Sequence, residues 1–149
     1  MPNTPPNNPV LSTPVDQSYL FGTILTFVFT VPSDIDDNKL VFNLELDINN
    51  PINSSSSYYK TCQSRFNNGT TNGKWEVQDG VGTYVTLPTG GIDSSYYGRT
   101  AKVTIKKQLT TQFPNIETIW YWRIGASDLL AGCQVFNRVV FAQGVFCSG

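Results

Sequence analysis

Short runs in which every second residue is apolar dominate this chain, and residues typical of turns separate the runs. Residues 25–31 place Leu25, Phe27 and Phe29 on one side, and residues 40–47 repeat the pattern. Successive side chains of a strand point to opposite faces of a sheet, so these runs predict half-buried strands. The same pattern predicts further strands at residues 58–65, 74–78, 81–87, 101–106, 120–124 and 135–146, the last as one or two strands.

These runs predict about eight short strands, which is typical of a β-sandwich. Residues 127–131 are long enough for one helical turn at most. The 149 residues suffice for one core, and nineteen aromatic side chains, as 3 Trp, 7 Tyr and 9 Phe, suit strands better than helices. The longest apolar stretch, residues 20–31, is interrupted by Gly and Thr and is too short for a membrane helix.

The missing residue types exclude several chemistries. The chain has no histidine, which removes His-dependent nucleophiles, His-ligated metals and the usual general base near neutral pH. Three cysteines, Cys62, Cys133 and Cys147, are too few for a four-cysteine zinc site. They are predicted to be thiols, with a Cys133–Cys147 bridge as the alternative. A net charge of −1 offers no basic surface for nucleic acid or anionic lipid.

The first 14 residues contain five of the nine prolines and no charged side chain. Proline fixes φ and lacks an N–H, so this arm is expected to be extended and outside any central strand. It is either a disordered leader or a tether that lies on a neighbouring subunit. The start has no basic residue and no apolar segment of the kind that signal peptides have, which predicts synthesis in a cytoplasm.

Three segments together resemble the fibronectin type III-like and immunoglobulin-like sandwich. They are the proline-rich residues 5–14, the strand, acidic turn and strand of residues 25–42, and residues 120–128, which contain Tyr-Trp-Arg-x-x-Ala-x-Asp. The resemblance implies one all-β sandwich over residues 15–149, preceded by the extended arm 1–14. The chain is longer than such modules, which run to about 100 residues. The excess falls in polar loops and an added hairpin between residues 48 and 100, where a specific function is expected.

Lone domains that resemble this one, without a signal peptide, occur on tailed-phage virions as capsid decoration proteins, head fibres and neck or tail appendages. Similar domains are accessory modules of secreted bacterial proteins and adhesins. The resemblance therefore implies either a bacteriophage virion structural protein or a carbohydrate-binding or adhesin module.

Two groups of acidic residues are candidates for chemistry. Asp34, Asp36 and Asp37 crowd one turn and form a weak calcium candidate, although the loop lacks the glycine of a calcium loop. Glu45 and Asp47 lie two residues apart on one strand, which is a spacing that a glycosidase pair would allow. Neighbours on one strand rarely share a cleft, so we expect these two carboxylates to form a polar outer face.

Aromatic residues in the polar loops suggest a second kind of site. Trp120 and Trp122 alternate with polar residues and are expected in the core. The remaining aromatic residues suit either a sugar-stacking platform or a protein contact. They are Tyr58, Tyr59, Trp75, Tyr96 and Tyr97.

Lys102, Lys106 and Lys107 form the one basic cluster, which is too small for nucleic acid and is expected to protect a sheet edge. The chain remains apolar almost to Gly149, so its end is expected to be held as a last strand or against a partner chain.

The sequence therefore predicts a non-catalytic structural protein without a cofactor, found in the virion, that acts through contacts with like subunits or other virion proteins. A host-surface glycan is the alternative partner. The predicted assembly contacts are Pro5, Pro6, Pro9, Val10, Leu11, Val145 and Phe146.

Overall fold

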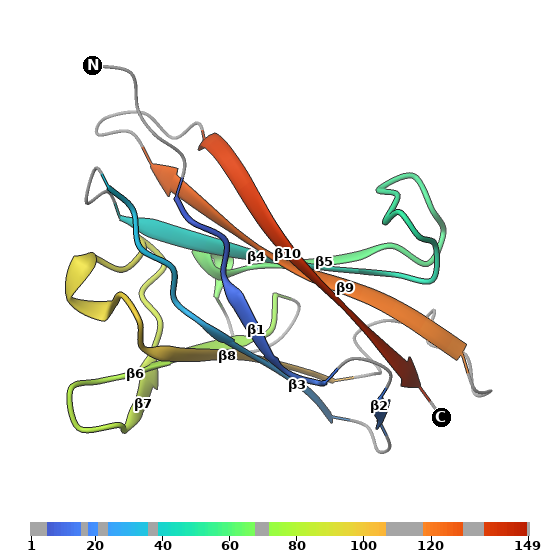
Figure 1. Cartoon of the computed structure of the whole chain (residues 1–149), viewed down its shortest axis with the longest axis horizontal. Helices are drawn as coiled ribbons and strands as arrows, with labels where there is room; N and C mark the ends of the chain where they lie inside the picture. The colour runs from blue at the N-terminus through green and yellow to red at the C-terminus, as the bar shows by residue number, and fades with distance from the viewer. Residues whose placement is uncertain are drawn as a thin grey trace.

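A computed structural model describes residues 6–15, 18–20, 24–35, 39–67, 72–106, 118–129 and 136–148 of the chain. These residues form two five-stranded sheets packed face to face (Figure 1). Sheet 1 contains β1 (Val10–Thr13), β3 (Ile24–Thr30), β6 (Lys74–Gln78), β7 (Tyr84–Thr86) and β8 (Thr100–Lys106). Sheet 2 contains β2 (Ser18–Leu20), β4 (Leu40–Asp47), β5 (Lys60–Gln63), β9 (Thr118–Leu129) and β10 (Phe136–Ser148).

The strand order is that of an immunoglobulin-like sandwich. Sheet 1 reads β1-β3-β8-β6-β7 and sheet 2 reads β2-β10-β9-β4-β5. We count β1 and β2 as two halves of the first strand, and β7 as an addition. The sheets then have the A-B-E-D and G-F-C orders of that fold, with β5 beside its C strand. Among the described residues, every ladder is antiparallel except the short pairing of β2 with β10. The prediction of one all-β sandwich is confirmed.

The strands follow the period-two runs closely in the middle of the chain. In β3, Leu25, Phe27 and Phe29 are buried while Ile24 and Thr26 are exposed. The β4 run occupies residues 40–47 as predicted, but its strand is buried on both faces. Residues 127–129, in the stretch long enough for one helical turn at most, form no helix. Ser127 and Asp128 instead pair with β4 and extend β9.

The described part of the chain contains two short 3₁₀ turns and no α-helix. These are η1 (Ser64–Phe66), which follows β5, and η2 (Ser94–Tyr96), which precedes β8. No helix in the described ranges is long and apolar enough to cross a membrane.

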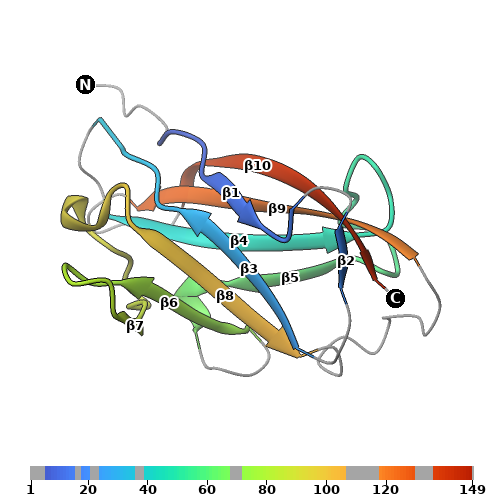
Figure 2. The same cartoon turned by 60° about the horizontal axis from the view of Figure 1, so that its bottom comes forward.

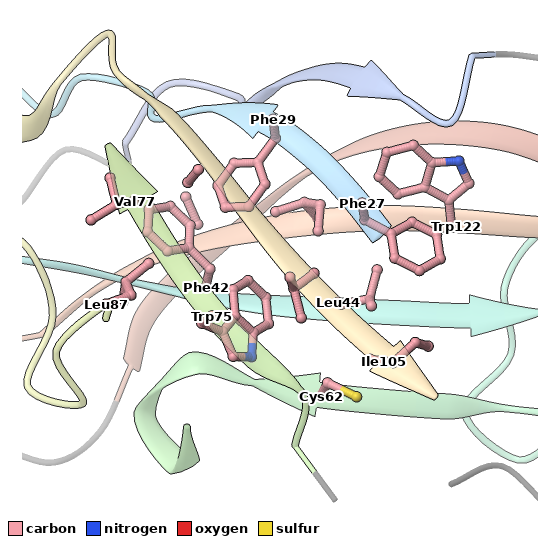
Figure 3. Close-up of a cluster of buried hydrophobic side chains, with 14 of the residues drawn as sticks. Phe27, Phe29, Phe42, Leu44, Cys62, Trp75, Val77, Leu87, Ile105 and Trp122 are labelled. Atoms are coloured by element: carbon pink, nitrogen blue, oxygen red, sulfur yellow. The ribbon is translucent and has the colours of Figure 1, made fainter. Parts of the chain in front are cut away.

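Aromatic side chains from both sheets meet in one core (Figure 3). Phe27 of sheet 1 packs on Trp122 of sheet 2 with ring centroids 5.0 Å apart. Phe29 contacts Phe42 at 5.1 Å, and Trp75 stacks on Phe42 at 6.5 Å. Such tilted and stacked pairs contribute beyond the area that they bury. The core therefore joins the two sheets through rings rather than through aliphatic side chains alone.

The Trp122 indole requires a glycine on the neighbouring strand. Gly144 of β10 lies directly opposite Trp122 of β9 in the ladder. A Cβ atom at residue 144 would lie 2.7 Å from Trp122 Nε1 and 2.9 Å from Cε2. The indole of Trp122 thus occupies the space that a side chain at residue 144 would need. The large residue fits because its cross-strand partner is glycine.

Candidate interaction sites

The two carboxylates of β4 are buried, which corrects the expectation of a solvated polar face. Glu45 is 5% exposed and Asp47 is 0% exposed, although both lie on the face of β4 opposite the core residues Leu44 and Leu46. Their hydrogen-bond partners lie in the segment that follows β4 and, for Glu45, also in β9. We define residues 48–59, which connect β4 to β5, as the β4–β5 loop.

Asp47 holds the beginning of this loop. Its carboxylate accepts hydrogen bonds from the backbone N–H groups of Ile48 and Asn53, both at 2.8 Å. The side-chain amide of Asn49 donates to the same carboxylate, at 3.2 Å to Oδ1. Burial by itself would raise the pKa of Asp47, but these hydrogen bonds, with one from Ser56, hold the pKa below its usual value. The charged form is therefore the one that organises the loop.

Glu45 holds the end of the same loop. The hydroxyl of Tyr59 donates a hydrogen bond to Glu45 Oε2, and Nε of Arg123 donates to Oε1 at 3.1 Å. Glu45 and Arg123 are also cross-strand partners between β4 and β9. Burial and the Glu45 carboxylate both raise the pKa of Tyr59, which therefore remains a donor. Two carboxylates on one strand thus fix both ends of one loop.

Hydrogen bonds inside the β4–β5 loop fix its middle. Ser56 N–H donates to the carbonyl of Asn53 at 2.9 Å, and Tyr59 N–H donates to that of Ser56 at 3.2 Å. The side chain of Asn53 accepts from Ser55 N–H, and that of Asn49 donates to the Ser56 hydroxyl, both at 2.9 Å. The loop extends beyond the ends of β4 and β5 (Figure 1). Its exposed residues are Asn49, Asn50, Pro51, Asn53, Ser54, Ser55 and Ser57.

The predicted aromatic platform is not assembled as one surface. Trp75 is 0% exposed, points into the core from β6 and cannot stack on a ligand, so its prediction as a binding residue is wrong. The Lys-Trp-Glu-Val alternation already placed Trp75 with Val77 on one face of the strand. That face is the core face. Trp120 and Trp122 are fully buried, as predicted.

The two tyrosine pairs lie at opposite ends of the sandwich. Tyr58 and Tyr59 end the β4–β5 loop, whereas Tyr96 and Tyr97 belong to η2 and the residue after it, at the other end (Figure 2). Tyr58 is partly buried against Trp120, with ring centroids 6.5 Å apart. Tyr96 and Tyr97 are also partly buried against the core. These four residues therefore form two separate groups.

The turn that carries Tyr96 has internal contacts of its own. Asp93 caps η2 by accepting a hydrogen bond from Ser95 N–H at 3.1 Å. The Ser95 side chain and backbone bonds hold the pKa of Asp93 below its usual value. The guanidinium of Arg99 lies 5.1 Å from the centroid of the Tyr96 ring. The charged groups of Asp93 and Arg99 therefore have contacts within the turn itself.

The calcium candidate gains no geometry from the structure. Asp34 is 2% exposed, and Asp36 and Asp37 lie outside the described residues. No cluster of three His, Cys, Asp or Glu side chains suited to a metal occurs among the residues that are described. Glu45, which would stand at the twelfth position of a calcium loop that begins at Asp34, bonds to Tyr59 and Arg123.

The basic cluster does not protect a sheet edge through Lys102. This residue belongs to β8, the central strand of sheet 1, so the expectation is wrong for it. Lys102 Nζ lies 4.1 Å from the Tyr84 ring centroid and 3.9 Å from Glu76, which also contacts Lys74 at 3.9 Å. Its charge is thus matched on the outer face of the sheet. The side chain of Lys106, and Lys107, lie outside the described part.

The cysteines are only partly placed. Cys62 is buried in the core and carries no disulfide, as predicted, and burial raises the pKa of its thiol to about 11. Cys133 lies outside the described residues. Cys147 is placed by its backbone in β10. The bridge between these last two stays a prediction.

Most of the predicted assembly residues that are described contribute to the sandwich itself. Pro6 and Pro9 are buried, and Leu11 packs against the core. Val10 is 64% exposed on β1. Pro5, and the side chains of Val145 and Phe146, lie outside the described part, but the backbone of both last residues belongs to β10. The apolar end of the chain is therefore the last strand of the fold, and the described part of the arm is an edge of it.

Two strands on one side of the sandwich have an edge without a ladder partner among the described residues. β1 pairs with β3 alone. β10 pairs with β9 along nearly its whole length, but β2 covers only residues 146–148 of its other edge. β1 and β10 run in the same direction beside each other (Figures 1 and 2). We call this side, formed by β1 and residues 136–145 of β10, the β1–β10 side.

Comparisons with known proteins do not assign a family. No protein-family model matches the chain, and no curated protein does. Among solved structures, the chain is similar to AggA, the major subunit of aggregative adherence fimbriae type I from Escherichia coli, at 13% identity. The match covers 96% of this chain and 97% of that chain, with a TM-score of 0.33. This TM-score is too low to establish a common fold, so the fold rests on the strand order given above.

Sequence reasoning missed one structural residue that joins distant segments. The side-chain amide of Asn67 donates to the carbonyls of Trp75 and Leu87, both at 3.0 Å, and accepts from Trp75 N–H at 3.1 Å. Asn67 thereby connects the end of η1 to β6 and to the residue after β7. Nothing distinguishes it in a run rich in asparagine, since its partners lie 8 and 20 residues away.

Proposed function

We propose that this chain is a non-catalytic structural subunit that assembles with like subunits through the β1–β10 side of the sandwich. The observation that carries the proposal is that β1 and residues 136–145 of β10, which lie beside each other, each have a ladder partner along one edge only among the described residues. Unpaired N–H and C=O groups of an edge are a template for pairing with another chain.

Exposure on this side supports the proposal. Val10 is 64% exposed on an edge strand that carries no charged side chain. Natural edge strands are commonly protected by Lys, by Pro or by a bulge. β1 has an irregular register between Leu11 and Thr13 but has neither Lys nor Pro within its four residues. An edge strand that exposes Val10 beside Ser12 and Thr13 and carries no charge is open to pairing with a partner strand.

The engagement of the carboxylates supports a role without catalysis. Glu45 and Asp47 hold the β4–β5 loop, and Glu76 contacts two lysines. Asp79 accepts hydrogen bonds from Val81 and Thr83 in the β6–β7 turn. Each of these four carboxylates binds a group of its own strand, of a neighbouring strand or of the adjoining turn. We therefore assign them a structural role and no reaction.

The setting that fits such a subunit is a bacteriophage virion, where it would act as a decoration, fibre or appendage protein assembled in the host cytoplasm. A bacterial surface assembly is the alternative setting. The proposed contact between like subunits is the same in each setting.

The test is the solution mass, measured by light scattering, of the wild-type chain and of Val10→Lys. We expect the wild-type chain to be oligomeric and Val10→Lys to have a lower mass, closer to that of the monomer. Pairing of the β1 edge would bury the charge of the lysine. Val81→Lys is the matched control, since Val81 is 87% exposed in the β6–β7 turn. A monomeric wild type at high concentration, or equal effects of both lysines, would contradict the proposal.

A further inference from the structure

We propose that the β4–β5 loop is a preformed binding site for a neutral glycan. The loop lies away from the β1–β10 side, so this function is additional to the proposed assembly and does not depend on it (Figure 1). Three features carry the inference: the loop is fixed before any ligand binds, its exposed groups match hydroxyl-rich ligands, and its apolar groups are turned inward.

The loop is fixed at both ends and in its middle. Asp47 is fully buried and binds two N–H groups and an amide at the start of the loop. Glu45 binds the Tyr59 hydroxyl at its end, and Ile52 is 8% exposed beneath it. A loop that is already ordered loses little conformational entropy when it binds. Burying a carboxylate is costly unless hydrogen-bond donors replace the lost water. Asp47 has such donors in the N–H groups and the amide just named.

The exposed part of the loop offers hydroxyl and amide groups and no charge. Residues 48–59 contain no Asp, Glu, Lys or Arg. Asn53, Ser54, Ser55 and Ser57 are exposed together within five positions. Such groups both donate and accept hydrogen bonds, as the hydroxyl groups of a sugar do. The absence of basic side chains in the loop argues against phosphate, sulfate or nucleic acid as the ligand.

The apolar side chains of the loop argue against a protein partner at this site. Protein interfaces depend on a few large apolar or aromatic anchors that enter the partner. Ile48 and Tyr58 pack against the core, and Ile52 is buried. These groups are therefore used within the chain. Tyr59 is partly exposed, with its hydroxyl held by Glu45, and supplies one fixed aromatic edge beside the polar groups.

The test is affinity electrophoresis of the full chain in gels that contain neutral polysaccharides, namely dextran, mannan and galactan. Gels with polygalacturonate and heparin serve as acidic counterparts. Retardation by at least one neutral polysaccharide is expected, and Ser54→Lys is expected to weaken it about tenfold because the lysine displaces the ligand from the loop. Ser94→Lys is the matched control, since Ser94 is an exposed serine of η2 at the opposite end of the molecule.

A second variant tests whether binding depends on the fixed conformation of the loop as well as on its exposed groups. Asp47→Asn keeps the exposed residues of the loop, Ser54 among them, but removes the charge that fixes its conformation. Binding is expected to weaken several-fold while circular dichroism still reports the folded sandwich. The proposal is overturned if no neutral polysaccharide retards the wild type, if only the acidic ones do, or if Ser94→Lys weakens binding as much as Ser54→Lys. None of these results bears on the light-scattering test of Val10→Lys.

Discussion

At the scale of single residues, the structure gives Asp47 a role that its position on a strand does not suggest. A carboxylate on the outer face of a sheet ordinarily points to water. Asp47 instead turns to the backbone that follows it and receives the N–H groups of Ile48 and Asn53. An Asp followed by Asn-rich residues is a turn signal, because short polar side chains bond to nearby backbone groups.

We predict that Asp47→Asn lowers the free energy of unfolding by about 2 kcal/mol at neutral pH, because hydrogen bonds to a charged acceptor are lost. Folding lowers the pKa of Asp47 below 3.8, so its contribution is full above that value and disappears as the pH falls through the folded-state pKa. Urea unfolding at pH ~7 and pH ~2.5 should show the difference between variant and wild type shrinking in acid. Asp93→Asn, in an exposed turn, is the control and should cost less. A difference that does not depend on pH would refute the assignment.

Gly144 allows a prediction about cross-strand size matching. Gly144→Ala places a methyl group 2.7 Å from Trp122 Nε1, and relief of this clash should cost about 1–3 kcal/mol. In Gly90→Ala the new methyl group meets nothing within 4 Å, so that variant should unfold near the wild type. Thermal unfolding followed by tryptophan fluorescence compares the two. Equal melting temperatures would show that the two strands adjust without cost.

At the scale of elements, the β6–β7 hairpin of sheet 1 is held by two kinds of contact, one local and one between distant residues. β6 and β7 form a hairpin whose turn is held by Asp79, which is a local contact that turn chemistry explains. The segment after η1 is joined to the same hairpin by Asn67, through a contact between distant residues. Local contacts leave signals in the sequence. Distant ones depend on which segments the fold brings together.

We predict that Asn67→Ala costs about 2–3 kcal/mol, because it leaves the N–H and C=O of Trp75 and the C=O of Leu87 without this partner. Chemical denaturation with matched slopes measures the loss. Asn8→Ala, at an exposed position of the first segment, is the control and should be neutral. If the variant changes the tryptophan fluorescence of the native protein but not the free energy of unfolding, Asn67 positions Trp75 without stabilising the fold.

At the scale of the whole molecule, one aromatic core holds the two sheets together. Trp75, Trp120 and Trp122 are all fully buried in it, and Cys62 lies in the same cluster. A domain of this size with one core usually unfolds in a single transition. The tryptophans and the thiol therefore report the same event.

We predict that, in a chain with Cys133→Ser and Cys147→Ser, iodoacetamide labels Cys62 only as the domain unfolds. Burial and a pKa raised to about 11 keep the native thiol protonated and inaccessible. The urea dependence of labelling should coincide with the change in tryptophan fluorescence. Labelling at urea concentrations below the fluorescence transition would reveal local opening of β5.

Much of the fold could be predicted from periodicity, because burial of one face imposes a period of two on the chain. β3, β4, β6 and β8 lie within one residue of the predicted runs. β5 and β7 are shorter than predicted, since Ser64 and Val81 belong to turns whose hydrogen bonds end the ladders. Periodicity did not indicate β1 and β2, because short edge strands carry little of it, although the resemblance covered residues 5–14, which contain β1.

The sequence by itself determined the all-β class, the single sandwich, the core positions of Trp120 and Trp122, and the absence of histidine chemistry. Each of these follows from residue type or local pattern. Only the tertiary structure decided that Trp75 is buried, that the two tyrosine pairs lie at opposite ends, and that Glu45 and Asp47 hold a loop. These facts depend on how distant segments pair and pack. A local pattern shows which residues of a strand share a face, but not what lies against that face.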